Sequence, residues 1–165
     1  MANPYTGSVA AALRKSQLLL ESAPAGGLHQ AAVQDAVVLQ LWLAYRAFLC
    51  ELAHQLQLGS QPESPGQLAR DAASRGMSSS EAAELEALAG DPESWLAGIE
   101  AAWLGLWQFS GSRASQGNGA GSPAQVIPLR DLSRQSAAPD LDALRNWRES
   151  MVELIRRQRA HMEEY

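Results

Sequence analysis

A carboxylate and an imidazole stand three residues apart within an apolar stretch, as Glu51-Leu-Ala-His54. On a helix this spacing puts both side chains on one face, and two such pairs with two more carboxylates hold the metal ions of di-iron helical bundles. The other inward candidates are single carboxylates without a neighbouring histidine ligand: Glu21, Glu100 and Glu153. Glu51 and His54 are therefore candidate metal ligands, and the alternative is a solvated pair on the outer face of the helix.

A second pattern with possible chemistry lies near the end of the chain, where Arg156 and His161 are separated by four residues. The spacing resembles the Arg-x4-His motif of the HEPN helical ribonucleases and nucleotide-binding bundles. That resemblance implies a phosphate-directed site in which the histidine is an acid or base and the arginine stabilises charge. The alternative is a cluster of cations at the end of a helix, where the helix dipole favours positive charge.

One arginine, Arg46, interrupts the apolar stretch, and a buried guanidinium needs a partner or a path to water. A carboxylate from another helix would supply that partner, and we expect Glu100 or Glu153 in this role. The result would be a structural ion pair between helices, and the alternative is an anion-binding site at Arg46.

The chain has five tryptophans and only two phenylalanines, which is unusual for a protein of this size. Large amphipathic rings suit both hydrophobic cores and partner surfaces. Trp107 lies off the apolar face of its expected helix and is followed closely by Phe109. We therefore interpret Trp107 and Phe109 as candidate partner-binding residues.

Composition narrows the classes of function. The 165 residues carry a net charge of −5, so the basic surface that nucleic-acid binding needs is not expected. Cys50 is the only cysteine, which excludes an intrachain disulfide and favours a buried thiol in a reducing compartment. The N-terminus lacks a secretory pattern, and Gln40 and Arg46 interrupt the longest apolar run. We expect a cytoplasmic protein without a membrane partner.

The elements that must position these residues are helices. The stretch 28–58 has no glycine or proline and repeats apolar residues at steps of three and four, which predicts one long central helix ending at Gly59. A first helix is expected from Asn3 to Glu21. Two short helices with Ser-x-x-Gln/Glu caps follow, then a long helix opened by Asp91-Pro92, and a last helix from Asp140 to at least Arg159.

Between the last two helices, residues 110–139 form a Gly/Ser-rich segment with the composition of a flexible linker. Its one apolar island is Val126-Ile127-Pro128-Leu129. The fold we predict is all-α, a single domain over 1–165: an antiparallel four-helix bundle with two short extra helices and a long flexible crossover before the last helix.

Several segments together resemble a family of small, uncharacterised all-helical bacterial proteins. These segments are Asn3-Pro-Tyr5, Ala44-Tyr-Arg-Ala-Phe-Leu49, Asp91-Pro-Glu-Ser-Trp-Leu-Ala97 and Arg157-Gln-Arg159. The resemblance implies a helical bundle and no assigned reaction, catalytic residue or cofactor.

Three hypotheses about function follow. The first is a non-enzymatic interaction module that binds another protein, with a homodimer as the alternative assembly. The second is a bundle enzyme, either di-iron-like through Glu51 and His54 or HEPN-like through Arg156 and His161. The third is a carrier of a small apolar ligand beneath the short helices.

Overall fold

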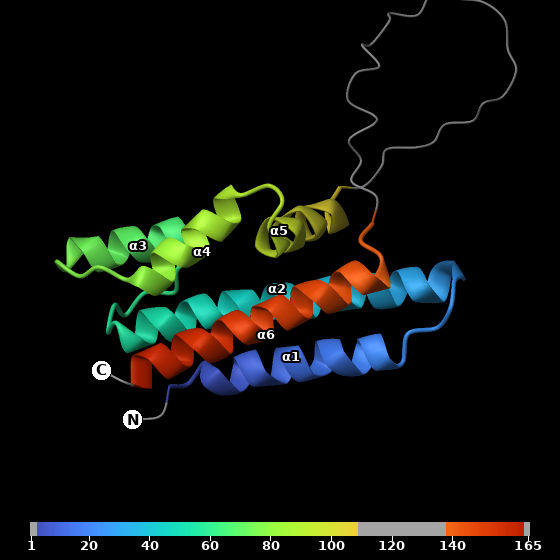
Figure 1. Cartoon of the computed structure of the whole chain (residues 1–165), viewed down its shortest axis with the longest axis horizontal. Helices are drawn as coiled ribbons and strands as arrows, with labels where there is room; N and C mark the ends of the chain where they lie inside the picture. The colour runs from blue at the N-terminus through green and yellow to red at the C-terminus, as the bar shows by residue number, and fades with distance from the viewer. Residues whose placement is uncertain (1–2, 109–137, 164–165) are drawn as a thin grey trace, which may run out of the picture.

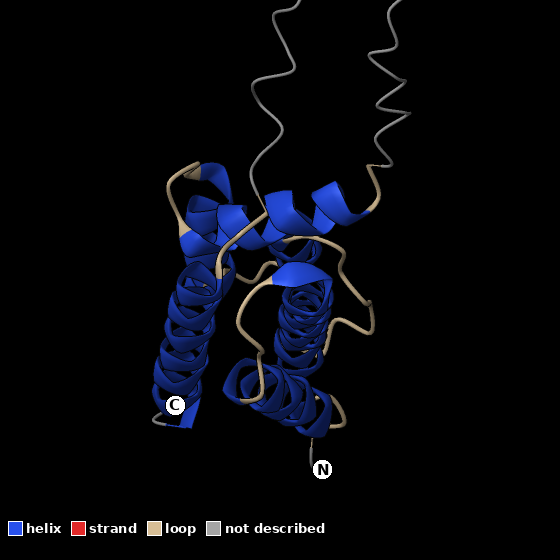
Figure 2. Cartoon of the chain, turned by 90° about the vertical axis from the view of Figure 1, so that its right-hand side faces the viewer, coloured by secondary structure: helices blue, strands red, loops and turns tan. Residues whose placement is uncertain are grey.

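The structure, a computed structural model, describes residues 3–108 and 138–163. These residues form six helices and no strand, which confirms the all-α prediction (Figure 2). The expected linker at 110–139 lies almost entirely outside the described residues, and so do Phe109 and Val126–Leu129.

Three long helices make the body of the bundle: α1 (Thr6–Glu21), α2 (Gly27–Gln55) and α6 (Leu141–Glu163). Figure 1 shows α1 and α2 running in opposite directions, and α6 running in the same direction as α2. Each of the three contacts the other two. The short helices α3 (Pro65–Ser74) and α4 (Ser80–Gly90), together with α5 (Trp95–Leu106), lie on one side of this body.

The central helix α2 is apolar on more than one face because α1, α3, α5 and α6 all contact it. Fully burying one large apolar side chain stabilises the fold by about 1.5–3 kcal/mol, so this helix supplies much of the core energy. By length and composition alone α2 could also cross a membrane, a weak criterion that the central helix of a bundle meets as well. Its largest buried side chains are Leu41, Tyr45, Phe48, Leu49 and Leu52.

The end of α2 differs from the prediction. The helix stops at Gln55, and Gln57 takes the left-handed conformation, with φ of 55°, that we expected at Gly59. The amide of Leu58 then donates to the carbonyl of Ala53 over 2.9 Å, which closes the last turn. Gly59 is also left-handed, but it belongs to the loop that follows.

The short helices begin at serine caps. The Ser64 hydroxyl accepts from the Gln67 amide over 3.2 Å at α3, and the Ser79 hydroxyl accepts from the Ala82 amide over 3.1 Å at α4. The second cap lies one residue later than the Ser78-to-Glu81 spacing predicts. Both helices pack onto the core through a few apolar side chains: Leu68, Ala72, Ala82 and Leu85.

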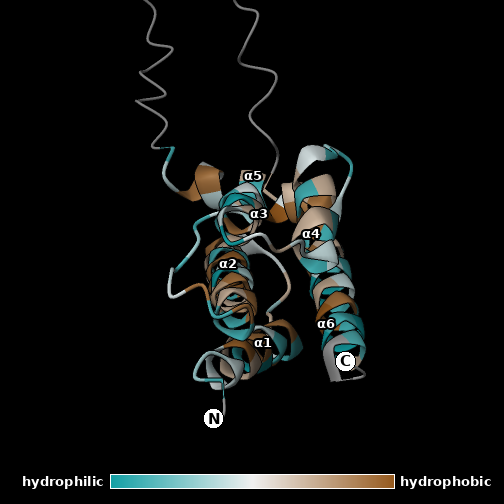
Figure 3. Ribbon diagram, turned by 90° about the vertical axis from the view of Figure 1, so that its left-hand side faces the viewer, coloured by the Kyte–Doolittle hydropathy of each residue, from teal (hydrophilic) through white to brown (hydrophobic). Residues whose placement is uncertain are grey.

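Helix α5 is shorter than expected, at 12 residues. Asp91 and Pro92 form a turn, and the helix starts only after Ser94, whose hydroxyl accepts from the Ala97 amide over 3.0 Å. Leu96 and Ile99 are fully buried. Figure 3 shows brown, hydrophobic ribbon on α5 and alternating brown and teal along α6.

Close packing joins α5 to α6 at Gly98. A Cβ atom added there would lie 2.6 Å from a ring carbon of Trp147, so only glycine lets the two helices approach this closely. Helix α6 itself begins as predicted, because the Asp140 carboxylate accepts from the Ala143 amide over 2.7 Å. Its inward face buries Leu144, Met151, Leu154 and Gln158.

Candidate binding surface

Aromatic rings from α2 and α5 meet where the two helices contact each other. The rings of Trp42 and Trp103 are stacked, with centroids 5.2 Å apart and planes 10° apart. Trp107 meets Trp103 edge-on, with centroids 5.4 Å apart, and Trp42 also contacts Tyr45. Offset stacks and edge contacts are the favourable geometries for aromatic pairs. The three indoles therefore form one continuous row.

The outer end of this row is exposed to solvent. Trp107 and Leu104 each expose 61% of their surface. On α2, Leu39 and Leu43 are exposed and lie four residues apart, and Leu39 precedes Trp42 by about one helical turn. We define the aromatic surface as Leu39, Trp42, Leu43, Trp103, Leu104 and Trp107.

Most of the exposed apolar side chains of the described residues lie on the two helices that carry the indoles, or at their ends. Six large hydrophobic residues of the described chain are exposed, and four of them belong to the aromatic surface. The remaining two, Leu18 and Leu28, lie on α1 and at the start of α2. Isolated exposed leucines are ordinary, whereas a cluster next to stacked indoles marks a place where another molecule can bind.

Glu100 lies at the inner end of the aromatic surface. The Tyr45 hydroxyl donates to its carboxylate over 3.2 Å, and Tyr45 is only 2% exposed. Burial raises the pKa of Glu100, although the hydrogen bond from Tyr45 acts in the opposite direction. Burial, with the nearby Glu100 charge, also raises the pKa of the Tyr45 hydroxyl, so Tyr45 remains a donor.

The expected ion pair between Arg46 and Glu100 or Glu153 is wrong. Arg46 instead donates through Nη1 to the Glu63 carbonyl over 3.1 Å, while its buried Nε has no hydrogen-bond partner in the described chain. Glu153 pairs with Arg156 on the surface of α6. A backbone carbonyl in the loop before α3 therefore takes the place of the expected carboxylate.

The prediction for Glu51 also needs correction. Glu51 is not solvated: it is 1% exposed and both of its oxygens accept from Arg159, over 2.8 and 2.7 Å. This bidentate pair joins the end of α2 to the end of α6. The Asn3 side chain donates to the Glu51 carbonyl over 2.9 Å, so the start of the chain is held at the same turn.

Because Arg159 bonds both oxygens of Glu51, this carboxylate is not free to bind a metal ion. His54 is exposed and its ring contacts Tyr5 edge-on, with centroids 6.3 Å apart, rather than joining Glu51 in a site. Within residues 3–108 and 138–163, no group of three His, Cys, Asp or Glu side chains is arranged to hold a metal ion. Cys50 is buried, as predicted.

The Arg156 and His161 pattern does not form a joint site either. Arg156 bonds Glu153 on its own helix, whereas His161 lies 3.8 Å from Glu81 of α4. Arg157 and Gln158 also bond α4, both at Glu84. These polar contacts attach the end of α6 to α4.

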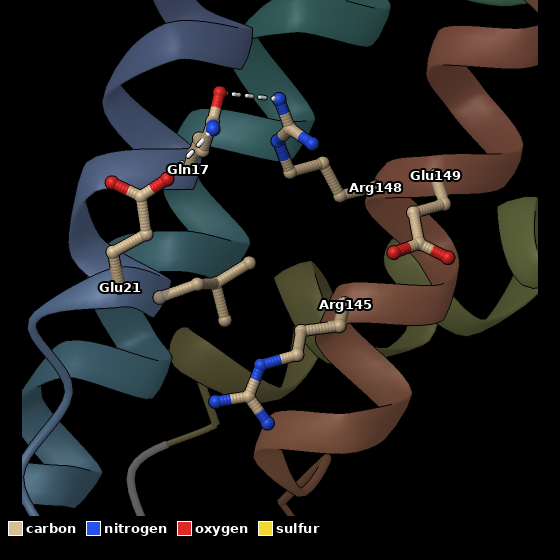
Figure 4. A pocket seen from close by; sticks show the side chains of 6 residues that line it. Gln17, Glu21, Arg145, Arg148 and Glu149 are labelled. Atoms are coloured by element: carbon tan, nitrogen blue, oxygen red, sulfur yellow. Dashed lines mark hydrogen bonds between the residues drawn. The ribbon is translucent and has the colours of Figure 1, made fainter.

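A polar pocket of about 330 Å³ lies between α1 and α6. Figure 4 shows Gln17 and Glu21 of α1 facing Arg145 and Arg148 of α6. Arg148 donates to Gln17 and to the Leu13 carbonyl, and Arg145 donates to Asp142 over 2.6 Å. Because both guanidinium groups already have partners within the chain, we interpret this pocket as a structural contact between helices.

The fold and these contacts define an all-helical bundle that carries an exposed aromatic surface and in which Glu51, Arg148 and Arg156 each bond another residue of the chain. The chain belongs to a family of unknown function, DUF6586, whose model matches residues 9–165. Comparison with curated proteins and with solved structures found no match.

Proposed function

We propose that this protein is a non-enzymatic interaction module that binds another protein through the aromatic surface. The observation that carries the proposal is the row of indoles at the contact between α2 and α5, whose outer end exposes Trp107 and its neighbour on the helix, Leu104. Tryptophan is among the residues that contribute most binding energy at protein interfaces, and its clusters tend to lie at their centres.

The aromatic surface is also held rigidly. Trp103 is stacked on Trp42, and α5 is anchored beneath by Leu96 and Ile99, which are fully buried. A preorganised surface loses little conformational entropy when a partner binds, so more of the contact energy appears as affinity. This rigidity supports a binding role for the surface.

The partners of the remaining charged groups support the same proposal. Glu51 bonds Arg159 and Arg156 bonds Glu153, so each enzyme hypothesis loses one of the two groups on which it depended. An interaction module needs no free acid, base or metal ligand, and the arrangement of these groups agrees with that role.

The test is affinity capture from cells of the source organism, followed by titration calorimetry with the purified partner. Trp107→Ala should weaken binding at least tenfold, since truncation of a central tryptophan commonly costs about 2 kcal/mol of binding energy. Leu43→Ser should also weaken binding.

Leu18→Ser provides the matched control, because Leu18 is 47% exposed and Leu43 is 46% exposed, but Leu18 lies outside the aromatic surface. This variant should bind like wild type. A partner whose affinity is unchanged by Trp107→Ala and Leu43→Ser would refute the proposal.

A further inference from the structure

We infer that the partner inserts an arginine side chain onto the aromatic surface, with its guanidinium group paired to Glu100. This inference rests on the proposed function and names the chemistry by which the partner would be recognised. It is carried by the position of an acidic group beside exposed indole and leucine side chains on α5.

The residues involved share one face of α5. Glu100, Trp103, Leu104 and Trp107 stand at positions i, i+3, i+4 and i+7, which follow one stripe of a helix. At 1.5 Å per residue, the stripe is about 10 Å long. A carboxylate thus lies at one end, an exposed indole at the other, and apolar side chains between them.

Glu100 has no cationic partner within the described chain. Its one hydrogen bond there comes from the Tyr45 hydroxyl, and no ion pair reaches it. A half-buried carboxylate without a cation keeps much of its desolvation cost, and a cation supplied from outside would offset that cost. The raised pKa of Glu100 is a consequence of the same surroundings.

Arginine fits this stripe better than lysine does. A guanidinium group is planar, binds a carboxylate through parallel N–H donors and stacks on aromatic faces. Its three-carbon stem can lie along apolar surface such as Leu104 while the charged end reaches Glu100. The net charge of −5 also attracts a basic partner at long range.

The chain itself contains a carboxylate recognised in this way. Glu51 accepts both of its hydrogen bonds from the Arg159 guanidinium, which is donated by a helix distant in sequence. Glu100 of α5 has no guanidinium partner of this kind among the described residues.

The test uses the full-length protein and two peptides, Ac-Ala-Leu-Arg-Leu-Ala-amide and its counterpart with citrulline in place of arginine. Citrulline keeps the shape of arginine without the charge. Binding is followed by NMR through the indole N–H signals of the five tryptophans. We expect the arginine peptide to shift the Trp103 and Trp107 signals and to bind at least fivefold more tightly than the citrulline peptide.

Glu100→Gln should reduce the affinity for the arginine peptide to that for the citrulline peptide, since the amide still accepts from Tyr45 but carries no charge. Glu93→Gln is the matched control, because it removes an exposed carboxylate from the turn before α5 and should change nothing. Circular dichroism checks that both variants fold.

Three results of the peptide experiment would overturn the inference. The two peptides could bind equally, the arginine peptide could bind Glu100→Gln as it binds wild type, or neither peptide could bind at millimolar concentration. None of these refutes the aromatic surface as a docking site, which the capture experiment tests separately. A wild-type dimer that Trp107→Ala converts to a monomer would assign the surface to a second copy and also overturn the inference.

Discussion

Two carboxylates, one on the central helix α2 and one on the neighbouring helix α5, differ in whether the chain supplies a cation for them. Glu51, at the end of α2, is 1% exposed and bonds Arg159 through both oxygens. Glu100, on α5, is half-buried and bonds only the Tyr45 hydroxyl within the described chain. The first is satisfied by the fold, whereas the second lacks a cation and lies beside exposed apolar groups. A buried carboxylate is structural when the chain supplies its guanidinium partner, as it does for Glu51. A carboxylate without such a partner, like Glu100, remains available to a cation from another molecule.

The first prediction removes the guanidinium from the satisfied carboxylate. Arg159→Met should lower the free energy of unfolding by about 3 kcal/mol, because it leaves Glu51 buried and unpaired. Urea denaturation at pH 7 measures the loss. Arg156→Met is the control, since its pair with Glu153 is exposed and should contribute nothing measurable. If the two variants were equally stable, the burial of Glu51 would not depend on Arg159, and Glu51 and Glu100 would no longer differ in this respect.

The second prediction concerns how firmly α5 holds Glu100 in place. Gly98→Ala should destabilise the fold by about 1 kcal/mol, because overpacking against Trp147 costs more than the gain in helix propensity returns. Gly105→Ala, on the same helix with no atom within 4 Å of the added methyl, should stabilise the protein by up to about 1 kcal/mol. Thermal unfolding followed by circular dichroism compares them, and a stabilised Gly98→Ala would mean that α5 does not pack this closely on α6.

The third prediction tests whether Glu100 lacks a cation. Its pKa is raised in the folded state, so the folded protein binds the proton more tightly than the unfolded chain does. Protonated Glu100 therefore contributes stability that is fully present below the pKa of a glutamate in the unfolded chain, about 4.3. This contribution is lost as the pH rises through the higher pKa of Glu100 in the folded protein. Glu100→Gln should therefore equal wild type at low pH and be more stable than wild type at pH 7.

Denaturation curves between pH 4 and 8 measure this difference, with Glu93→Gln as the variant expected to show none. If Glu100→Gln were less stable than wild type at pH 7, the carboxylate would have a stabilising partner and the two carboxylates would not differ in kind.

The helices could be predicted from the sequence because apolar spacing and serine or aspartate caps are local signals. Asp140 caps α6 as its sequence position predicts. The errors arose where two residues compete for one role. Gln57, rather than Gly59, takes the left-handed conformation at the end of α2. Ser94, rather than Asp91, caps α5.

The candidate site was less predictable. Exposure of Trp107 followed from its position off the apolar face, but its contact with Trp103 and the stack on Trp42 depend on how α5 is placed against α2. Spacing within a helix also gave no signal for the partner of Glu51, because Arg159 lies 108 positions away in sequence. Long-range placement decides these contacts, and one sequence does not supply it.

That separation of 108 positions has a consequence for the order of folding. Helices α1 and α2 are joined by a short loop, so they can pair early at a low cost in chain entropy, whereas α6 must be brought back across a much longer closure. We expect α6 to dock last and the ion pair with Glu51 to form after the rate-limiting step. The pair then slows unfolding rather than speeding folding, and stopped-flow kinetics of Arg159→Met should show faster unfolding with an unchanged folding rate.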